Sequence, residues 1–360
     1  MRASHAHSLC SFGLRVRHVT PNTRHSCRLP LLLCCFLLLA ALPVPCSLAK
    51  TSDVLQPDNF GYAVRIAVPR HEKAVAASGF YYRDDGSLYV VTARHVLFAA
   101  TQVEIKEGGA FPIPRQLIHR IKYDAKGRLL SLEGVLSSQE RDAMLQHPSV
   151  TEDGRRAIEY LYEKSQKLRL KGHTAIVATC LPGTGELELG LTRMLAGGFI
   201  KYHPVQDVAV IKLGNEGKCG ADMCTGFLPE VRVKKPGDVL ALDAAHVGLL
   251  TDVAVGSTAF VFGYDAPTAN QQPPQRGSPM LRKTSVVGKS KELGLIMLDG
   301  VAHPGDSGGL ALEVDQASPG NGFKGIGVVS SAFHLEKEKE GRRNYSLAVA
   351  LDAVLDLLRK

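Results

Sequence analysis

The stretch Gly305-Asp306-Ser307-Gly308-Gly309 places a serine between small residues, directly after His303-Pro304. Glycines on both sides remove the Cβ atoms that would keep a substrate carbonyl away from a nucleophilic hydroxyl. They also permit backbone angles that turn successive N–H groups toward a developing oxyanion. Because glycine-rich turns with Ser or Asp are common in loops, this stretch alone is equally compatible with a simple turn.

A serine hydroxyl needs a neighbouring base to take its proton, so a histidine and an orienting acid are sought upstream. His95 ends the run Thr92-Ala93-Arg94-His95, which follows an apolar strand. Asp207 opens the apolar run Asp207-Val208-Ala209-Val210-Ile211. Each residue type is usually structural when it occurs singly, but three such sites in the order His, Asp, Ser indicate nucleophilic catalysis.

These three motifs resemble those of the chymotrypsin-like (trypsin-fold) serine peptidases, over most of residues 60–350. The resemblance is closer to the bacterial and HtrA-type branch, because Val96 follows the histidine where animal members carry a disulfide cysteine. It implies an all-β fold of two antiparallel six-stranded β-barrels, with the active site between them and without a PDZ module.

The resemblance also implies roles for individual residues. Ser307 attacks the scissile carbonyl, His95 takes and returns the proton, and Asp207 holds the imidazole. The backbone N–H groups of Gly305 and Ser307 form the oxyanion hole. Protein or peptide substrates are expected, and no metal or cofactor is required.

Val301, six residues before the serine, is placed by the resemblance at the base of the substrate pocket, with Ser330 and Ala332 on its wall. A Lys or Arg side chain of a substrate would lack a carboxylate partner there, and an unpaired buried charge is costly. We therefore expect a preference for aliphatic or medium apolar P1 side chains. A contribution from His303 or His334 would instead favour an acidic P1 residue.

Activation in animal members uses a newly cut amino terminus that pairs with the aspartate before the serine. The chain has no Ile/Val-Val-Gly-Gly segment after a basic residue that could pair with Asp306 in this way. We expect the enzyme to need no such cleavage.

Residues 1–49 are predicted to be a signal peptide, with an apolar run at 31–42 and a cleavage site at Ser47-Leu48-Ala49. The run is short for a bilayer span, but the long basic leader leaves a retained signal anchor as an alternative. Cleavage predicts a secreted or periplasmic protein without stable membrane insertion. Five of the 43 basic residues and none of the 35 acidic ones lie in this segment, so the remainder carries +3. Its charges are interspersed, which gives no nucleic-acid signal.

Three of the eight cysteines lie outside the signal peptide. Cys219 and Cys224 are five residues apart in a loop that could close as a small disulfide. A metal site would need more ligands than this loop supplies. Cys180 is expected to be a buried free thiol.

Residues 50–360 are predicted to form one peptidase domain, with a first barrel at about 60–215, a second at about 236–350 and a terminal helix at 351–358. Short β-rich runs bounded by turn residues support this. They are 62–68, 78–82, 88–92, 102–105, 174–179, 199–202, 208–213, 239–242, 259–264, 284–287, 293–298, 310–313, 325–330 and 345–350. A helical insertion at about 137–170 begins with the capping box Ser137 to Glu140. It either decorates the first barrel or acts as a lid or docking surface.

Two other functions fit part of this pattern. The glycine-rich stretch also satisfies the G-x-S-x-G elbow of α/β-hydrolase esterases, for which Asp315 and His334 could be nominated as partners after the serine. That fold needs long alternation of strands and helices, which is missing here. A catalytically inactive trypsin-like scaffold that binds partners is the second alternative. The oligomeric state is left open.

Overall fold

The computed structural model describes residues 61–69, 75–102, 117, 120–123, 129–179, 185–219, 222–236, 239–264, 279–300, 302–314, 322–337 and 341–359. Side chains at 75, 123, 129–130, 217–219, 222–224, 333–337 and 341–343 are not described. The predicted signal peptide, Val301 and Cys180 lie outside the described residues. Within these ranges, no helix has both the length and the apolar composition that a bilayer crossing requires.

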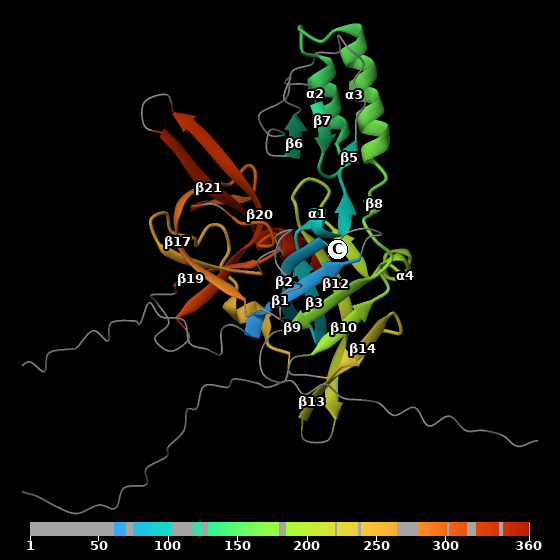
Figure 1. Cartoon of the computed structure of the whole chain (residues 1–360), viewed down its shortest axis with the longest axis vertical. Coiled ribbons are helices and arrows are strands. Elements are labelled where there is room, and N and C mark those ends of the chain that lie inside the picture. Colours follow the sequence, from blue (N-terminus) through green and yellow to red (C-terminus); the bar gives the residue numbers. More distant parts are fainter. Residues whose placement is uncertain are drawn as a thin grey trace, which may run out of the picture.

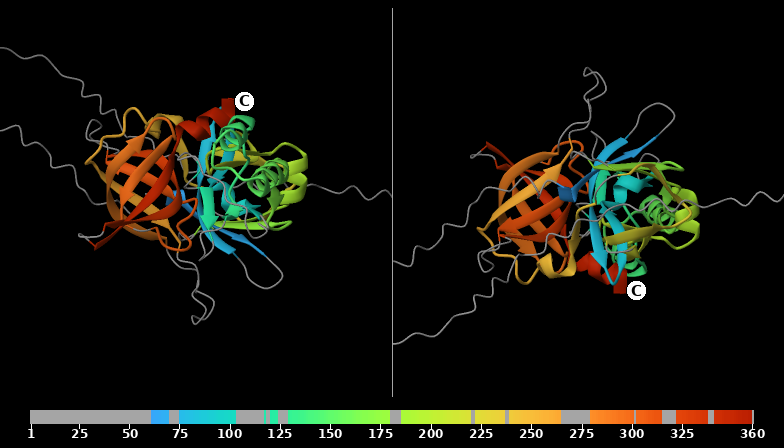
Figure 2. Two further views of the ribbon diagram at one scale, coloured as in Figure 1. Left: turned by 90° about the horizontal axis from the view of Figure 1, so that it is seen from above. Right: turned by 90° about the horizontal axis from the view of Figure 1, so that it is seen from below.

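The second half of the chain closes into a six-stranded antiparallel barrel, drawn in orange and red in Figures 1 and 2. Its strand order is β16-β17-β18-β21-β20-β19. The strands are β16 (Thr258–Gly263), β17 (Met280–Ser290), β18 (Leu295–Asp299), β19 (Leu310–Val314), β20 (Phe323–Lys337) and β21 (Gly341–Ala350). Aliphatic side chains such as Val261, Val286 and Ile296 form one buried cluster of this barrel. Pairing all round leaves the barrel without an open edge.

The first half forms a ten-stranded sheet whose main path is β11-β12-β3-β2-β1-β9-β10-β14. The strands are β1 (Ala63–Val68), β2 (Val75–Asp84), β3 (Ser87–Thr92), β9 (Ala175–Thr179), β10 (Glu186–Leu189), β11 (Ile200–Tyr202), β12 (Ala209–Cys219), β13 (Asp222–Phe227), β14 (Val231–Lys235) and β15 (Ala241–Asp243). The edge strands β11 and β14 pair with β12 and β10 and not with each other, so this unit is a curled half-barrel. With the closed barrel, it confirms the predicted all-β fold of two β units.

Strand β15 falls in the range that the sequence assigned to the second barrel. It pairs in parallel with β2 in the first sheet, through Ala241 opposite Tyr81. Strands β10, β13 and β14 and helix α4 (Leu191–Ala196) were not expected from the sequence. The short, charge-alternating β10 becomes a strand because β9 and β14 supply partners on both sides.

The insertion begins at Phe98, after the short helical turn that follows β3, and stands away from both sheets in Figure 1. Strands β4 (Phe98–Ala99) and β8 (Arg169–Leu170) pair where the chain leaves and returns. Beyond them lie a small sheet of β5 (Thr101–Gln102), β6 (Ile121–Tyr123) and β7 (Leu129–Leu132), and helices α2 (Ser138–Leu145) and α3 (Glu152–Ser165). The insertion is therefore larger than the helical pair expected at 137–170.

The predicted capping box is confirmed at the start of α2. Ser137 Oγ accepts from the Glu140 N–H at 3.2 Å, and Glu140 Oε2 accepts from the Ser137 N–H at 2.8 Å. Met144, Ile158 and Leu161 are buried with residues from the small sheet in a cluster separate from the other cores. With its own core, the insertion is a folded subdomain and not a loose excursion.

A third hydrophobic cluster joins the two halves. Phe80 and Val91 of the first sheet pack in one cluster with Phe262 and Leu310 of the barrel. The terminal helix α5 (Asp352–Arg359) adds buried side chains to this cluster, which confirms the amphipathic helix predicted at 351–358. The halves are thus held face to face, and side chains at their junction can form a shared site.

Candidate active site

His95 lies in α1 (Arg94–Leu97), a single turn of helix that follows β3. Its backbone N–H donates to Asp207 Oδ1 at 2.8 Å, and its ring Nδ1 lies 2.6 Å from Asp207 Oδ2. An ionised carboxylate only accepts, so Nδ1 carries the proton and Nε2 is left as the acceptor. This is the tautomer that a general base needs.

Asp207 is itself held by a second hydroxyl and by a buried arginine. Ser330 Oγ donates to Asp207 Oδ2 at 2.6 Å. The guanidinium of Arg94, which is 1% exposed, donates to the carbonyl of Pro204 at 2.8 Å and to that of His203. The loop that carries the aspartate is therefore tied to the residue next to the histidine. Arg94 lies in the motif Thr92-Ala93-Arg94-His95, but no local pattern there predicts this role.

The electrostatics of the pair favour charge separation. Burial alone would raise the pKa of Asp207, but His95, Arg94 and the Ser330 hydroxyl hold it well below its usual range. Burial alone would lower the pKa of His95, whereas Asp207 and then Glu133 raise it above its ordinary value. Burial lowers the pKa of Arg94 to about 10, so this side chain stays cationic at neutral pH.

The turn that carries Ser307 packs against β2 and against the end of β3, the strand that leads to His95. The Ser78 N–H donates to the Ser307 carbonyl at 2.9 Å. A Cβ on Gly308, which has φ +86°, would lie 2.1 Å from the Ser78 carbonyl oxygen and 2.2 Å from Thr92 Oγ1. The Gly308 N–H also donates to Val329 at 2.7 Å, next to Ser330. Glycine at position 308 thus allows the turn that carries Ser307 to lie close to Ser78 of β2 and Thr92 of β3.

The backbone before the serine is also fixed. Gly305 has φ +106°, and its carbonyl accepts from Ser78 Oγ at 2.7 Å. The Asp306 N–H donates to the His303 carbonyl at 3.0 Å. Across the described part of the chain, the N–H groups of Gly305 and Ser307 donate to no backbone carbonyl. Their role as an oxyanion hole stays a prediction.

A cavity of about 220 Å³ lies beside this turn in the second barrel. Its lining includes Ala302, Val329, Arg282 and the fully buried Asp306. Among the residues predicted for the substrate pocket, Ser330 donates its hydroxyl hydrogen bond to Asp207, and Ala332 is exposed on β20. Val301 lies outside the described residues, and the side chain of His334 is not described.

Cys219 ends β12 and Cys224 lies in β13, and these two strands pair antiparallel. Cys219 is registered opposite Asp222, and Cys224 opposite Gly217. The cysteine side chains are not described, so the disulfide stays a prediction.

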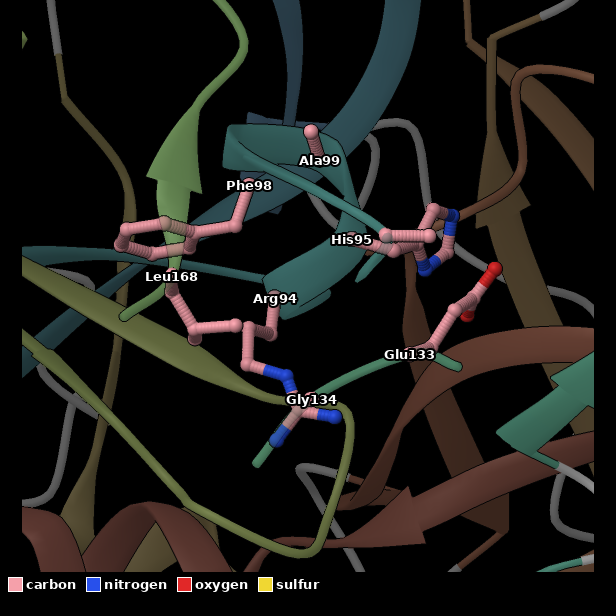
Figure 3. A pocket seen from close by; sticks show the side chains of 8 residues that line it. Arg94, His95, Phe98, Ala99, Glu133, Gly134 and Leu168 are labelled. Atoms are coloured by element: carbon pink, nitrogen blue, oxygen red, sulfur yellow. The ribbon is translucent and has the colours of Figure 1, made fainter. Parts of the chain in front are cut away.

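One group of three metal-ligand types occurs in the described residues. Single ligand atoms of His95, Glu133 and Asp207 lie within 4.8 Å of one another. Because the ring Nδ1 is already hydrogen-bonded to Asp207, the group is best described as an acid–base cluster. Glu133 had no sequence signal, since it reaches the site only through the fold of the insertion. Figure 3 shows its carboxylate directed toward the His95 ring.

A closed barrel and a curled half-barrel, with this site at their junction, form the all-β, two-unit arrangement that the sequence predicted. No protein-family model matches the chain, and no curated protein matches its sequence. Similar solved structures include the HtrA-type protease AlgW with a tripeptide, at 12% identity and TM-score 0.37, covering 83% of this chain and 60% of that one. A serine endoprotease from Yersinia pestis is similar at 11% identity and TM-score 0.36, covering 85% of this chain and 67% of that one. The chain thus spans only about 60% of the AlgW length. At these scores the similarity supports no inference about activity.

Proposed function

We propose that the chain is a serine endopeptidase that hydrolyses protein or peptide bonds through an acyl-enzyme. Ser307 is the nucleophile, His95 the general base and acid, and Asp207 the residue that orients the imidazole. The observation that supports this most is the Asp207 carboxylate, which accepts from the His95 N–H, the His95 ring and the Ser330 hydroxyl. Such convergence is typical of an aspartate that stabilises an imidazolium.

In this mechanism, Ser307 loses its proton to His95 Nε2 as its oxygen bonds to the carbonyl carbon. The carbonyl oxygen becomes an oxyanion that accepts from the N–H groups of Gly305 and Ser307, each worth roughly 2.7–4 kcal/mol in comparable enzymes. The imidazolium then protonates the leaving amine. Water repeats the sequence on the acyl-enzyme and releases the second product.

The esterase alternative does not fit the fold. An α/β-hydrolase places its serine above a mostly parallel sheet. Among the named strands of the described residues, by contrast, the pairs are antiparallel except for β15 with β2. The inactive scaffold remains the alternative to an enzyme, and it differs from the enzyme in the reactivity of the serine.

Labelling with a fluorophosphonate tests the proposal directly. Wild-type protein should label, and Ser307→Ala and His95→Ala should each abolish labelling without loss of the folded state. Ser149→Ala, an exposed serine in the insertion, is the matched control and should label like the wild type. An unlabelled wild type would establish the scaffold alternative, and full labelling of Ser307→Ala would show that another serine reacts.

We also propose export, from the sequence of residues 1–49. Amino-terminal sequencing of the protein recovered outside the cytoplasm should give a start near Lys50. An intact leader on membrane-bound protein would show that the segment is a signal anchor.

A further inference from the structure

The insertion brings a second carboxylate, in addition to that of Asp207, close to His95, the candidate base. Glu133, in the loop after β7, points its carboxylate toward the ring of His95 (Figure 3). Ligand-type atoms of Glu133, His95 and Asp207 lie within 4.8 Å of one another. The Glu133 side chain is 18% exposed, so water screens its charge only partly.

The backbone of Glu133 is held from inside the insertion. Its N–H donates to the Arg120 carbonyl at 2.8 Å, and Arg120 Nε donates back to the Glu133 carbonyl at 3.0 Å. Arg120 is 2% exposed and also binds Glu140 Oε1 at 2.9 Å, at the start of α2. The carboxylate is therefore fixed to the folded subdomain and does not sit on a free loop.

The same loop is connected to the chain that carries Asp207. The Val135 N–H donates to the Pro204 carbonyl at 3.1 Å, which also accepts from Arg94. Gly134 has φ +92°, and a Cβ there would lie 2.2 Å from the Arg94 guanidinium. The Pro204 carbonyl and Arg94 thus contact both segments that bring a carboxylate to His95, the segment of Asp207 and the segment of Glu133.

The charged groups that act on the imidazole come from three segments. Asp207 and Glu133 raise the pKa of His95, while burial and Lys171 lower it. Lys122, from β6, partly offsets Glu133, because its Nζ lies 2.8 Å from Glu133 Oε1. Lys122 is 66% exposed, so this offset is itself screened by water.

We propose that Glu133 is a positioning residue of the proposed peptidase, through which the insertion stabilises the imidazolium form of His95 alongside Asp207. This inference rests on the proposed function. The imidazolium exists while the serine is bonded to the substrate carbonyl, so a second nearby carboxylate favours the tetrahedral intermediate. The same carboxylate also keeps His95 of the free enzyme protonated up to a higher pH, and a protonated His95 cannot act as the base.

The test is the pH profile of fluorophosphonate labelling in Glu133→Gln, which keeps the shape and removes the charge. The acid limb should move down by about 0.5–1 pH unit, the scale expected for a partly screened carboxylate at this separation. Lys122→Met is the matched variant. It frees Glu133 from its cation and should move the limb in the opposite direction. A merely structural role would lower the labelling rate of both variants with no shift of the limb.

A second measurement does not depend on activity. Titration of the His95 ring by NMR in a Ser307→Ala background should show the same downward shift on Glu133→Gln. If wild type labels and neither profile moves, the inference is overturned while the proposed function stands. If wild type does not label, the proposed function fails, and the NMR titration still decides whether Glu133 acts on His95.

Discussion

Arg282 Nη1, on β17, lies 3.2 Å from Oδ1 of Asp306, the residue before the candidate nucleophile. Asp306 is fully buried, and its other oxygen accepts from the His303 N–H at 2.7 Å. An internal cation therefore lies beside this carboxylate. A buried carboxylate paired in this way holds the turn that presents Gly305 and Ser307.

A chain that begins near Lys50 should accordingly turn over a peptide ester directly. The internal pair of Arg282 and Asp306 supplies the charge that activation cleavage would create. The measurement is ester hydrolysis by purified protein before and after brief trypsin treatment. Activity that appears only after nicking would contradict the expectation.

Arg282→Met should damage both stability and activity. It leaves the carboxylate of Asp306 buried without its cation, at a cost of about 3–5 kcal/mol by analogy with other broken buried pairs. Urea unfolding gives the stability change, and the labelling rate reports the state of the turn. Lys291→Met, an exposed lysine in a neighbouring turn, should stay within about 0.5 kcal/mol of wild type. Equal behaviour of the two variants would argue against a structural role for the pair.

Activity should fall as pH drops through the pKa of His95, which lies above its ordinary value of 6.5. The base must be neutral to accept a proton, so the acid limb of kcat/KM should lie above pH 6.5. For stability, a raised folded pKa means that the His95 contribution is fully present below about pH 6.5 and is lost as pH rises through the folded value. For Asp207, whose pKa is depressed, the contribution is lost as pH falls into the acid range. An acid limb below pH 6 would contradict the arrangement.

Gly308→Ala should abolish labelling, because its Cβ would overlap the Ser78 carbonyl at 2.1 Å and displace Ser307. Gly256 provides a control with φ +91° and open space around its Cβ position. Gly256→Ala should cost only the backbone strain, about 1 kcal/mol, and keep full labelling. Labelling that survives in Gly308→Ala would show that the close approach of the Ser307 turn to β2 and β3 is not needed.

Cleavage of a mixed peptide library should show a preference for aliphatic or medium apolar P1 residues. The expectation comes from the placement of Val301. The nearby cavity is lined by apolar residues such as Ala302 and Val329 and also by charged ones such as Arg282, so it does not decide the preference. Sequencing of the cleavage products gives the preference. A dominant choice of Arg or Lys would show that Val301 is misplaced, and a dominant choice of Asp or Glu would indicate a basic group in the pocket.

Much of the fold could be predicted because its elements leave local signals. Apolar runs bounded by turns marked most strands, and Ser137 with Glu140 marked the start of α2. The strands that were missed, such as β10 (Glu186–Leu189), carry charges on alternate positions and depend on partners far along the chain. The sequence also could not predict that the first sheet stays open. Local patterns show where strands lie, but whether a sheet closes depends on which strands pair with one another.

For the candidate site, the residue types His95, Asp207 and Ser307 and their order could be predicted from local patterns. These are a serine between glycines, an apolar strand that ends before His95 and an apolar strand that begins after Asp207. The charged side chains that surround these three residues depend on the tertiary structure. Arg282 reaches Asp306 across the barrel, and Glu133 reaches His95 from a separate subdomain. Neither pair has a local pattern, because a charged side chain on a strand or in a loop looks like any solvated residue. Its partner is set only when the topology brings distant segments together and removes the water between them.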